Sequence, residues 1–386
     1  MAGTPRRANP SGRRHLRPLF LWAKSSFVAK SLAFIGESEF RVAVAAALLP
    51  QSPIAAPLCA GEDILDRLVR LMDGDLEACN REIVARMQSP VALIPQLAAH
   101  IVAAGGKRLR PLLTLAAARL CGYQQGQRHV ALAACVEFIH TATLLHDDVV
   151  DESNLRRGLA SANAVFGNKA SVLVGDFLFA RAFQLMVADG SLRVLAILSR
   201  AAATIAEGEV LQLVTQNDLE TTEARYLDVV RGKTAALFEA ACEVGAVVAG
   251  REDAAPALAA YGGNLGIAFQ LVDDALDYAA EQATLGKTVG DDFREGKVTL
   301  PVLVAFAAGD ETERRFWQRT VGEGRIGEDD LAQAMALMAR HRAIETTLAR
   351  AANSAREARA ALAFFPASPL RAVLEDVADY TVARGR

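Results

Sequence analysis

The stretch AVFGNKASVLVGDFLFARAFQLMVADG, residues 164–190, places apolar side chains at positions i, i+3, i+4 and i+7. This spacing collects them on one side of an α-helix and therefore predicts an amphipathic helix. DILDRLVRLMDGDLEACNREIVARM, residues 63–87, has the same pattern. Breaks fall at glycine and proline, as at Ser89-Pro90 and Gly262-Gly263, and no convincing alternating pattern indicates a strand. The predicted fold class is all-α.

The bulk composition favours one large helical domain. The chain has 386 residues, of which 52% are hydrophobic, and a formal net charge of −3. A charge so near zero gives no reason to expect nucleic acid as a partner. No uninterrupted apolar run has the ~18 residues of a spanning helix, so we expect no transmembrane segment. The five cysteines are scattered without CxxC spacing, which indicates reduced thiols and a cytoplasmic protein.

The N-terminal region differs from the rest of the chain. Seven basic residues precede the first acidic residue, Glu37: Arg6, Arg7, Arg13, Arg14, Arg17, Lys24 and Lys30. We expect residues 1–60 to be a basic, disordered extension, or sequence upstream of the true start. A mitochondrial transit peptide is the alternative reading of a basic, acid-poor segment. The helical domain is expected to span residues 61–386.

Three aspartates close an apolar run in LLHDDVVDESNLRRG, residues 144–158. Asp147 and Asp151 are four residues apart and project from one side of a helix, with Asp148 one position further round. Clustered carboxylates repel one another unless a cation joins them. An exposed acidic patch at a helix end is the plainer explanation for this stretch taken alone.

A second stretch, AFQLVDDALDY at residues 268–278, repeats the D-D-x-x-D spacing with Asp273, Asp274 and Asp277. Two such matches in one chain are rarely accidental. Two acidic faces turned toward each other would form a site of hard oxygen ligands. Such a site suits Mg²⁺, which takes its remaining ligands from water and substrate phosphates. The sequence therefore predicts a magnesium site.

Basic residues lie near both motifs and predict a site for more than one phosphate group, because arginine and lysine pair with phosphate oxygens. They are Lys107, Arg108, Arg110, Arg156, Arg157, Lys233, Lys287 and Lys297. Singly, each could be an ordinary solvated charge. His140 lies two helical turns before Asp147 and could join the site or simply be a core residue.

These motifs resemble the signature regions of trans-polyprenyl diphosphate synthases. The resemblance rests on GGKRLRP, LLHDDVVDESNLRRG, KTAALFEAACEVGA, FQLVDDALDY and GKTVGDDFREGKVTLP, and it covers about residues 62–386. It implies an isoprenoid synthase-type helical bundle around a central apolar cavity, usually a homodimer. The implied reaction condenses isopentenyl diphosphate with an allylic diphosphate.

The resemblance also assigns roles to individual residues. It implies Mg²⁺ ligands at Asp147, Asp151 and Asp273, and counts Asp148, Asp274, Lys233 and Lys287 with these as catalytic. The allylic diphosphate would contact Arg156, Lys233, Thr234, Gln270, Lys287 and Lys297. Isopentenyl diphosphate would contact Lys107, Arg110, His140 and Arg157. No protein nucleophile is needed, and the sequence offers no convincing one.

Product length is expected to depend on the helix before the first motif. In this family, bulky side chains four or five residues before the first aspartate often block the growing chain, but here these positions are Ala142 and Thr143. A channel could then follow the helix for roughly 28 Å, so we expect a product of about C40–C50 for a quinone side chain. Phe138, further down the helix, could narrow the channel. Simple packing of Ala142 against a neighbouring helix is the alternative.

Other functions fit the residues less well. A short-chain synthase making farnesyl or geranylgeranyl diphosphate is the nearest alternative. A terpene cyclase would usually carry Asn, Ser or Thr with Glu in its second motif, and a non-catalytic subunit would typically lose aspartates. A metal phosphohydrolase would need further histidines in a suitable arrangement. Peripheral membrane contact is expected only for release of the product.

Overall fold

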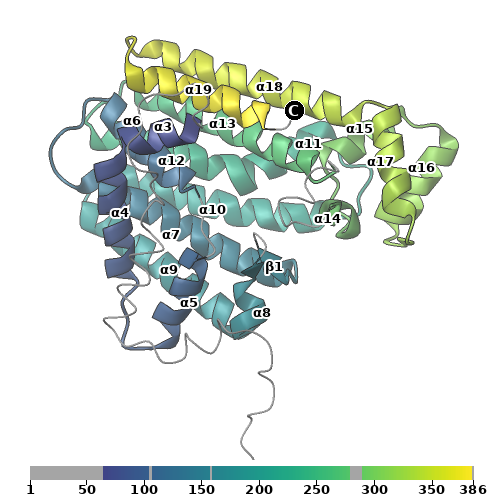
Figure 1. The fold of residues 1–386 in the computed structure, drawn as a ribbon, viewed down its shortest axis with the longest axis horizontal. Coiled ribbons are helices and arrows are strands. Elements are labelled where there is room, and N and C mark those ends of the chain that lie inside the picture. Colours follow the sequence, from purple (N-terminus) through teal and green to yellow (C-terminus); the bar gives the residue numbers. More distant parts are fainter. Residues whose placement is uncertain (1–63, 104–106, 157–158, 279–288, 385–386) are drawn as a thin grey trace, which may run out of the picture.

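The computed structural model describes residues 64–103, 107–156, 159–278 and 289–384. These residues form an almost entirely helical bundle with one short antiparallel hairpin (Figure 1). Residues 1–60, for which we expected a basic extension, lie outside the described residues.

The first half of the bundle contains the first aspartate motif, at the end of α7. Its elements are α3 (Ile64–Leu71), α4 (Asp73–Arg86), α5 (Leu93–Ala103), α6 (Leu109–Leu120), α7 (Arg128–Val150), β1 (Leu155–Arg156), β2 (Leu159–Ala160), α8 (Ala162–Phe166), α9 (Asn168–Asp189) and α10 (Leu192–Thr215). Leu155 pairs with Ala160, and Arg156 pairs with Leu159, across the β1–β2 hairpin. This hairpin directly follows the end of α7 and so holds Arg156 near the motif.

The second half contains the second motif, at the end of α13, and the remaining helices of the bundle. Its elements are α11 (Glu223–Val230), η1 (Arg231–Ala235), α12 (Ala236–Val248), α13 (Ala255–Leu276), α14 (Asp291–Arg294), α15 (Leu300–Ala308), α16 (Glu311–Trp317), η3 (Gln318–Gly322), α17 (Asp330–Arg340), α18 (Ala343–Ala361), η4 (Leu362–Phe364) and α19 (Pro369–Ala383). The segment η1 is a π-helical turn between α11 and α12. It carries Lys233 and Thr234.

The helices pack in layers around α12 and α13. In Figure 1, α18 and α19 lie across one edge, α13 and α12 lie beneath them, and α10, α7 and α9 follow. Contacts between α13 and α18, α12 and α13, α6 and α12, and α7 and α9 link the layers. Phe138, Phe238 and Tyr261 are among the largest fully buried side chains of the core. The predicted all-α class is confirmed.

Two of the described helices, α7 and α9, are long and apolar enough to cross a membrane by length and composition. We expected no such segment because charged residues interrupt both runs. In the bundle, α7 is buried over 67% of its most apolar stretch and α9 over 44%. The composition of α7 therefore suits a core helix, whereas α9 keeps an exposed apolar side.

Candidate active site

Both aspartate motifs lie at the C-terminal ends of helices. Asp147 and Asp148 occupy the last turn of α7, and Asp273 and Asp274 occupy the last turn of α13. A helix C-terminus carries partial negative charge, so carboxylates there are unfavourable unless cations approach them. The fold thus concentrates negative charge at the C-terminal ends of α7 and α13, where a nearby cation is stabilising.

Asp147 meets its cation on η1. The Lys233 ammonium lies 2.9 Å from Asp147 Oδ1 and 2.8 Å from Glu209 Oε2 on α10. Burial alone would raise the pKa of Asp147, but Lys233, with Lys297 and Arg156, brings that pKa below its ordinary value. Burial raises the pKa of Glu209 to about 7, with Lys233 opposing the rise and Asp147 adding to it.

Lys297 is the cationic partner of Asp151. Its Nζ lies 3.0 Å from Asp151 Oδ2 and 2.6 Å from Glu295 Oε2. Burial would lower the pKa of Lys297, but Asp292 and Asp151 raise it above the ordinary value. Asp292 belongs to the segment that follows the second motif, and its backbone N–H donates to Asp277. Lys297 therefore lies in the field of both motifs.

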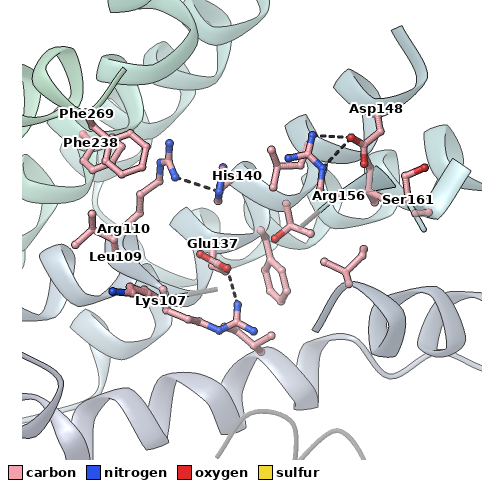
Figure 2. A pocket seen from close by; sticks show the side chains of 18 of the residues that line it. Lys107, Leu109, Arg110, Glu137, His140, Asp148, Arg156, Ser161, Phe238 and Phe269 are labelled. Carbon is pink, nitrogen blue, oxygen red and sulfur yellow. Dashed lines mark hydrogen bonds and ion pairs between the residues drawn. The ribbon is translucent and has the colours of Figure 1, made fainter. Parts of the chain in front are cut away.

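Asp148 pairs with an arginine. Its carboxylate is 3% exposed and accepts from Arg156 Nε at 2.8 Å, with Nη2 at 2.6 Å (Figure 2). Asn163 donates to the Asp148 backbone carbonyl. Because burying an unpaired carboxylate is costly, the guanidinium is what permits Asp148 to occupy this position. In this structure Arg156 is thus oriented by the motif itself.

A chain of hydrogen bonds joins η1, α13 and α11 through the second motif. The Thr234 hydroxyl donates to Gln270 Oε1 at 2.7 Å, and Gln270 Nε2 donates to Asp274 Oδ1 at 2.7 Å. The Tyr226 hydroxyl donates to the other oxygen of Asp274. Burial raises the pKa of Asp274 to about 7, although both donors oppose the rise. Asp274 of the second motif is therefore held by neutral partners.

A cavity of about 430 Å³ lies beside the first motif. Figure 2 shows Arg110 and His140 in contact where they line it, with Arg110 Nη1 3.0 Å from His140 Nε2. The Arg110 guanidinium also lies over the Phe238 ring, 4.4 Å from its centre. Lys107 reaches the Tyr380 hydroxyl at 3.3 Å. Three residues predicted to share the isopentenyl diphosphate pocket thus line one cavity, as do Asp148 and Arg156.

The three residues predicted to set product length fall in different places. Phe138 lines the cavity with Thr141, Leu144 and Leu145. The described wall of the cavity does not include Ala142, which is fully buried, or Thr143, whose hydroxyl donates to the His140 carbonyl. The apolar side chains of α7 that line the cavity thus lie on the side of the helix that carries Phe138. The predictions for Arg157 and Lys287 fall outside the described residues.

The carboxylates suit a divalent cation by their chemistry. Asp147 and Asp151 offer hard oxygen donors, and each already has an ammonium group within 3.0 Å. In the described ranges, no three His, Cys, Asp or Glu side chains are gathered in an arrangement ready to hold a metal. The carboxylate oxygens of Asp147 and Asp151 fit a hard cation, which would bind either in place of the two lysines or beside them.

Several residues of the site escaped the sequence analysis. Glu209 and Tyr226 lie far from the motifs in sequence and reach them through α10 and α11. Arg384 lines the cavity and lies over the Phe269 ring, 3.9 Å from its centre. One sequence feature could have indicated that Glu209 has a role in the site. It is a charged residue next to a glycine inside an apolar run, in EGEV at residues 207–210. Spacing gave no comparable signal for the others.

Comparison with known proteins decides the family. A family model described as Polyprenyl synthetase matches residues 91–338, well over half of the chain. The chain belongs to the polyprenyl synthetase family. The predicted resemblance is confirmed, and the matched span contains both aspartate motifs and all the cavity residues from Glu137 to Phe269.

Individual relatives in this family cover most of the chain. Octaprenyl diphosphate synthase of Escherichia coli is 47% identical over 323 residues, which is 83% of this chain and 99% of that protein. The structure of a decaprenyl diphosphate synthase from Rhodobacter capsulatus is 56% identical, with a TM-score of 0.80, and covers 83% of this chain and 99% of its own.

A third relative shows ligands in this fold. A polyprenyl synthase from Caulobacter crescentus, 55% identical with a TM-score of 0.81, was solved with calcium and isoprenyl diphosphate. The match covers 86% of this chain and 100% of that one. A divalent cation and a diphosphate thus occur together in a relative. These matches also confirm the isoprenoid synthase-type fold.

Proposed function

We propose that this chain condenses isopentenyl diphosphate head-to-tail onto an allylic diphosphate and makes a long all-trans polyprenyl diphosphate. The observation that carries the proposal is the first aspartate motif, in which Asp147 and Asp151 pair with Lys233 and Lys297, beside a cavity lined by cations and apolar side chains. The octaprenyl and decaprenyl synthases that resemble this chain support the long-chain product.

The cofactor is Mg²⁺, held by Asp147, Asp151 and Asp273. Hard carboxylate oxygens and a diphosphate substrate match the preference of this ion. When bound, Mg²⁺ supplies positive charge to the diphosphate group that leaves the allylic substrate. In this proposal Lys233, Lys297, Thr234 and Gln270 bind the same diphosphate group.

The chain's own residues bind the second substrate and protect the reaction. Lys107, Arg110 and His140 present donors to the diphosphate of isopentenyl diphosphate, and we extend this role to Arg157. Fixed donors stabilise developing negative charge without reorganising during the reaction. Phe138, Leu144 and Leu145 keep that part of the cavity apolar, which helps exclude water from a cationic allylic intermediate. Arg156 and Lys287 complete the allylic site in this proposal.

A product-length assay tests the function directly. Purified protein receives Mg²⁺, farnesyl diphosphate and labelled isopentenyl diphosphate, and the dephosphorylated products are separated by length. Products of octaprenyl to decaprenyl length are expected. A stop at geranylgeranyl would contradict the long-chain product while leaving elongation intact, and no elongation would contradict the proposed reaction.

Phe138 is the proposed length determinant that the cavity supports best. Phe138→Ala should lengthen the product, whereas Ala142→Phe and Thr143→Phe test the positions outside the cavity wall. If Ala142→Phe shortens the product and Phe138→Ala leaves it unchanged, the growing chain follows the Ala142 side of α7 instead.

We further propose that the protein is a homodimer through α9 and α10. Of the 16 exposed large apolar side chains in the described residues, eight lie on these helices: Val172, Leu173, Phe183, Val187, Leu192, Val210, Leu213 and Val214. Covering so much apolar surface favours association. Leu173→Glu with Val210→Glu should give a monomer in light scattering, whereas Leu71→Glu on α3 should not. Wild-type monomers that bind lipid vesicles would instead favour a membrane surface.

The proposed compartment is the cytoplasm. Four cysteines in the described part of the chain, Cys79, Cys121, Cys135 and Cys242, are buried free thiols. This state suits a reducing environment. Fractionation of cells that make the full chain checks the compartment and tests the mitochondrial alternative.

A further inference from the structure

Glu209 contributes a carboxylate to the site from outside both aspartate motifs. Its Oε2 lies 2.8 Å from Lys233 Nζ, while the same ammonium lies 2.9 Å from Asp147 Oδ1. The side chains of Lys233, Asp147 and Glu209 are 22%, 14% and 31% exposed, so water screens this group incompletely. One half-buried ammonium therefore bridges carboxylates from two different helices.

The backbone explains why Glu209 meets Lys233. A Cβ at Gly208 would lie 2.5 Å from the Lys233 backbone nitrogen, and one at Gly232 would lie 2.9 Å from Gly208 Cα. Glycine at both positions thus lets α10 and η1 cross with their backbones in contact. Glu209 and Lys233 each follow one of these glycines in sequence. The crossing brings the two charged side chains together.

We propose that Glu209 is a positioning residue that holds Lys233 in the site and so leaves Asp147 available to a divalent metal. The inference rests on the proposed metal role of Asp147. A metal must compete with the ammonium for the Asp147 carboxylate. Glu209 supplies Lys233 with a second anionic partner, which weakens this competition.

Mn²⁺ binding to the full-length protein, followed by electron paramagnetic resonance without substrates, tests the inference. Glu209→Gln should raise the Mn²⁺ dissociation constant by about tenfold, as expected for a residue that orients a metal ligand. Glu209→Asp should recover most of the affinity because the lysine side chain can follow a shorter carboxylate. Glu207→Gln is the matched control, since Glu207 is exposed on the same helix, and should change the constant less than twofold.

Lys233→Met separates positioning from direct ligation. If Glu209 acts through the lysine, the loss caused by Glu209→Gln should largely disappear in the Lys233→Met background, as the double-mutant cycle requires. An equal loss in both backgrounds would overturn the inference and make Glu209 a direct ligand. Wild-type affinity in Glu209→Gln, with an unchanged unfolding temperature, would overturn it as well.

Asp147→Asn keeps the two proposals distinguishable. A large loss of Mn²⁺ affinity in this variant supports the metal role on which the inference rests. Wild-type affinity would overturn that metal role, whatever Glu209 does. Elongation by the wild-type enzyme remains a separate measurement of the proposed reaction.

Discussion

The two aspartate motifs share the D-D-x-x-D spacing and the same place at a helix C-terminus, but their carboxylates meet different partners. Asp147, Asp148 and Asp151 each contact a cation. Asp274 instead accepts from Tyr226 and Gln270, which are neutral. The pKa of Asp147 is accordingly lowered, and that of Asp274 is raised to about 7.

This difference shows that the surroundings, and not the motif, set the charge of each carboxylate. Burial disfavours the charged form of an aspartate, and a nearby cation can reverse that effect. In the first motif the cations come from η1, from the β1–β2 hairpin and from the segment after α14. In the second motif, Asp274 depends on hydrogen bonds from α11 and α13.

The largest effect is expected from removing a proposed metal ligand in either motif. Asp147→Ala and Asp273→Ala should each lower the elongation rate by about 10²–10³-fold, because electrostatic stabilisation of the leaving diphosphate is lost. Labelled isopentenyl diphosphate incorporation measures the rate, and thermal unfolding checks that the fold persists. Near-native rates in either variant would refute the metal role of that aspartate.

The middle aspartates should differ in their effect on stability. Asp148→Ala should lower the free energy of unfolding by about 2–4 kcal/mol, because it leaves Arg156 without its buried partner. Asp274→Asn should cost about 1 kcal/mol, because its partners are neutral and the amide keeps one acceptor. Urea unfolding with EDTA present measures both values. Equal costs would mean that the cation contributes no more than the neutral donors.

The pH dependence of stability should report Asp274. Its pKa is raised in the folded state, so the folded protein holds a proton that the unfolded chain releases above about pH 4. This contribution is fully present below about pH 4 and is lost as the pH rises through about 7. With EDTA, the unfolding temperature of Asp274→Asn should therefore fall less between pH 5 and 8 than that of the wild type. Identical pH profiles of the unfolding temperature in the variant and the wild type would show that a group other than Asp274 titrates.

The smallest effect is expected from the hydroxyl of Tyr226. Tyr226→Phe removes the hydrogen bond to Asp274 and should lower the free energy of unfolding by about 1 kcal/mol. Because that bond lowers the pKa of Asp274, its loss should also move the pH-dependent fall in stability to higher pH. Urea unfolding at several pH values checks both effects. A shift to lower pH would show that Tyr226 stabilises the protonated form.

The sequence predicted the parts of the fold and site that depend on local pattern. Helical periodicity predicted the all-α bundle, and the spacing of Asp147 and Asp151 predicted their shared helix end. The resemblance predicted that Lys107, Arg110 and His140 share one pocket, and these three residues line one cavity. Each of these predictions needed only short-range spacing or a known family pattern.

The partners of each carboxylate could not be read in the same way. Glu209 and Tyr226 reach the motifs only because α10 and α11 pack beside η1 and α13. Helical periodicity states which face of a helix is buried but not which helix lies against it. The cavity wall on α7 likewise depends on packing, and the structure places Phe138 there rather than Ala142. These contacts require the three-dimensional arrangement.

The π-helical turn at η1 has a consequence for how this region tolerates change in length. A π-helical turn holds one residue more than the regular helix around it, and such turns often occur at functional sites. Deleting one residue from 231–235 would restore a continuous α-helix across α11 and α12. Since the π-helical turn accommodates its extra residue within one turn, α11 and α12 would keep nearly the same rotation relative to each other when that residue is removed. A one-residue deletion here would therefore leave Tyr226 beside Asp274 but change the direction in which the side chains of 231–235, Lys233 among them, leave the helix.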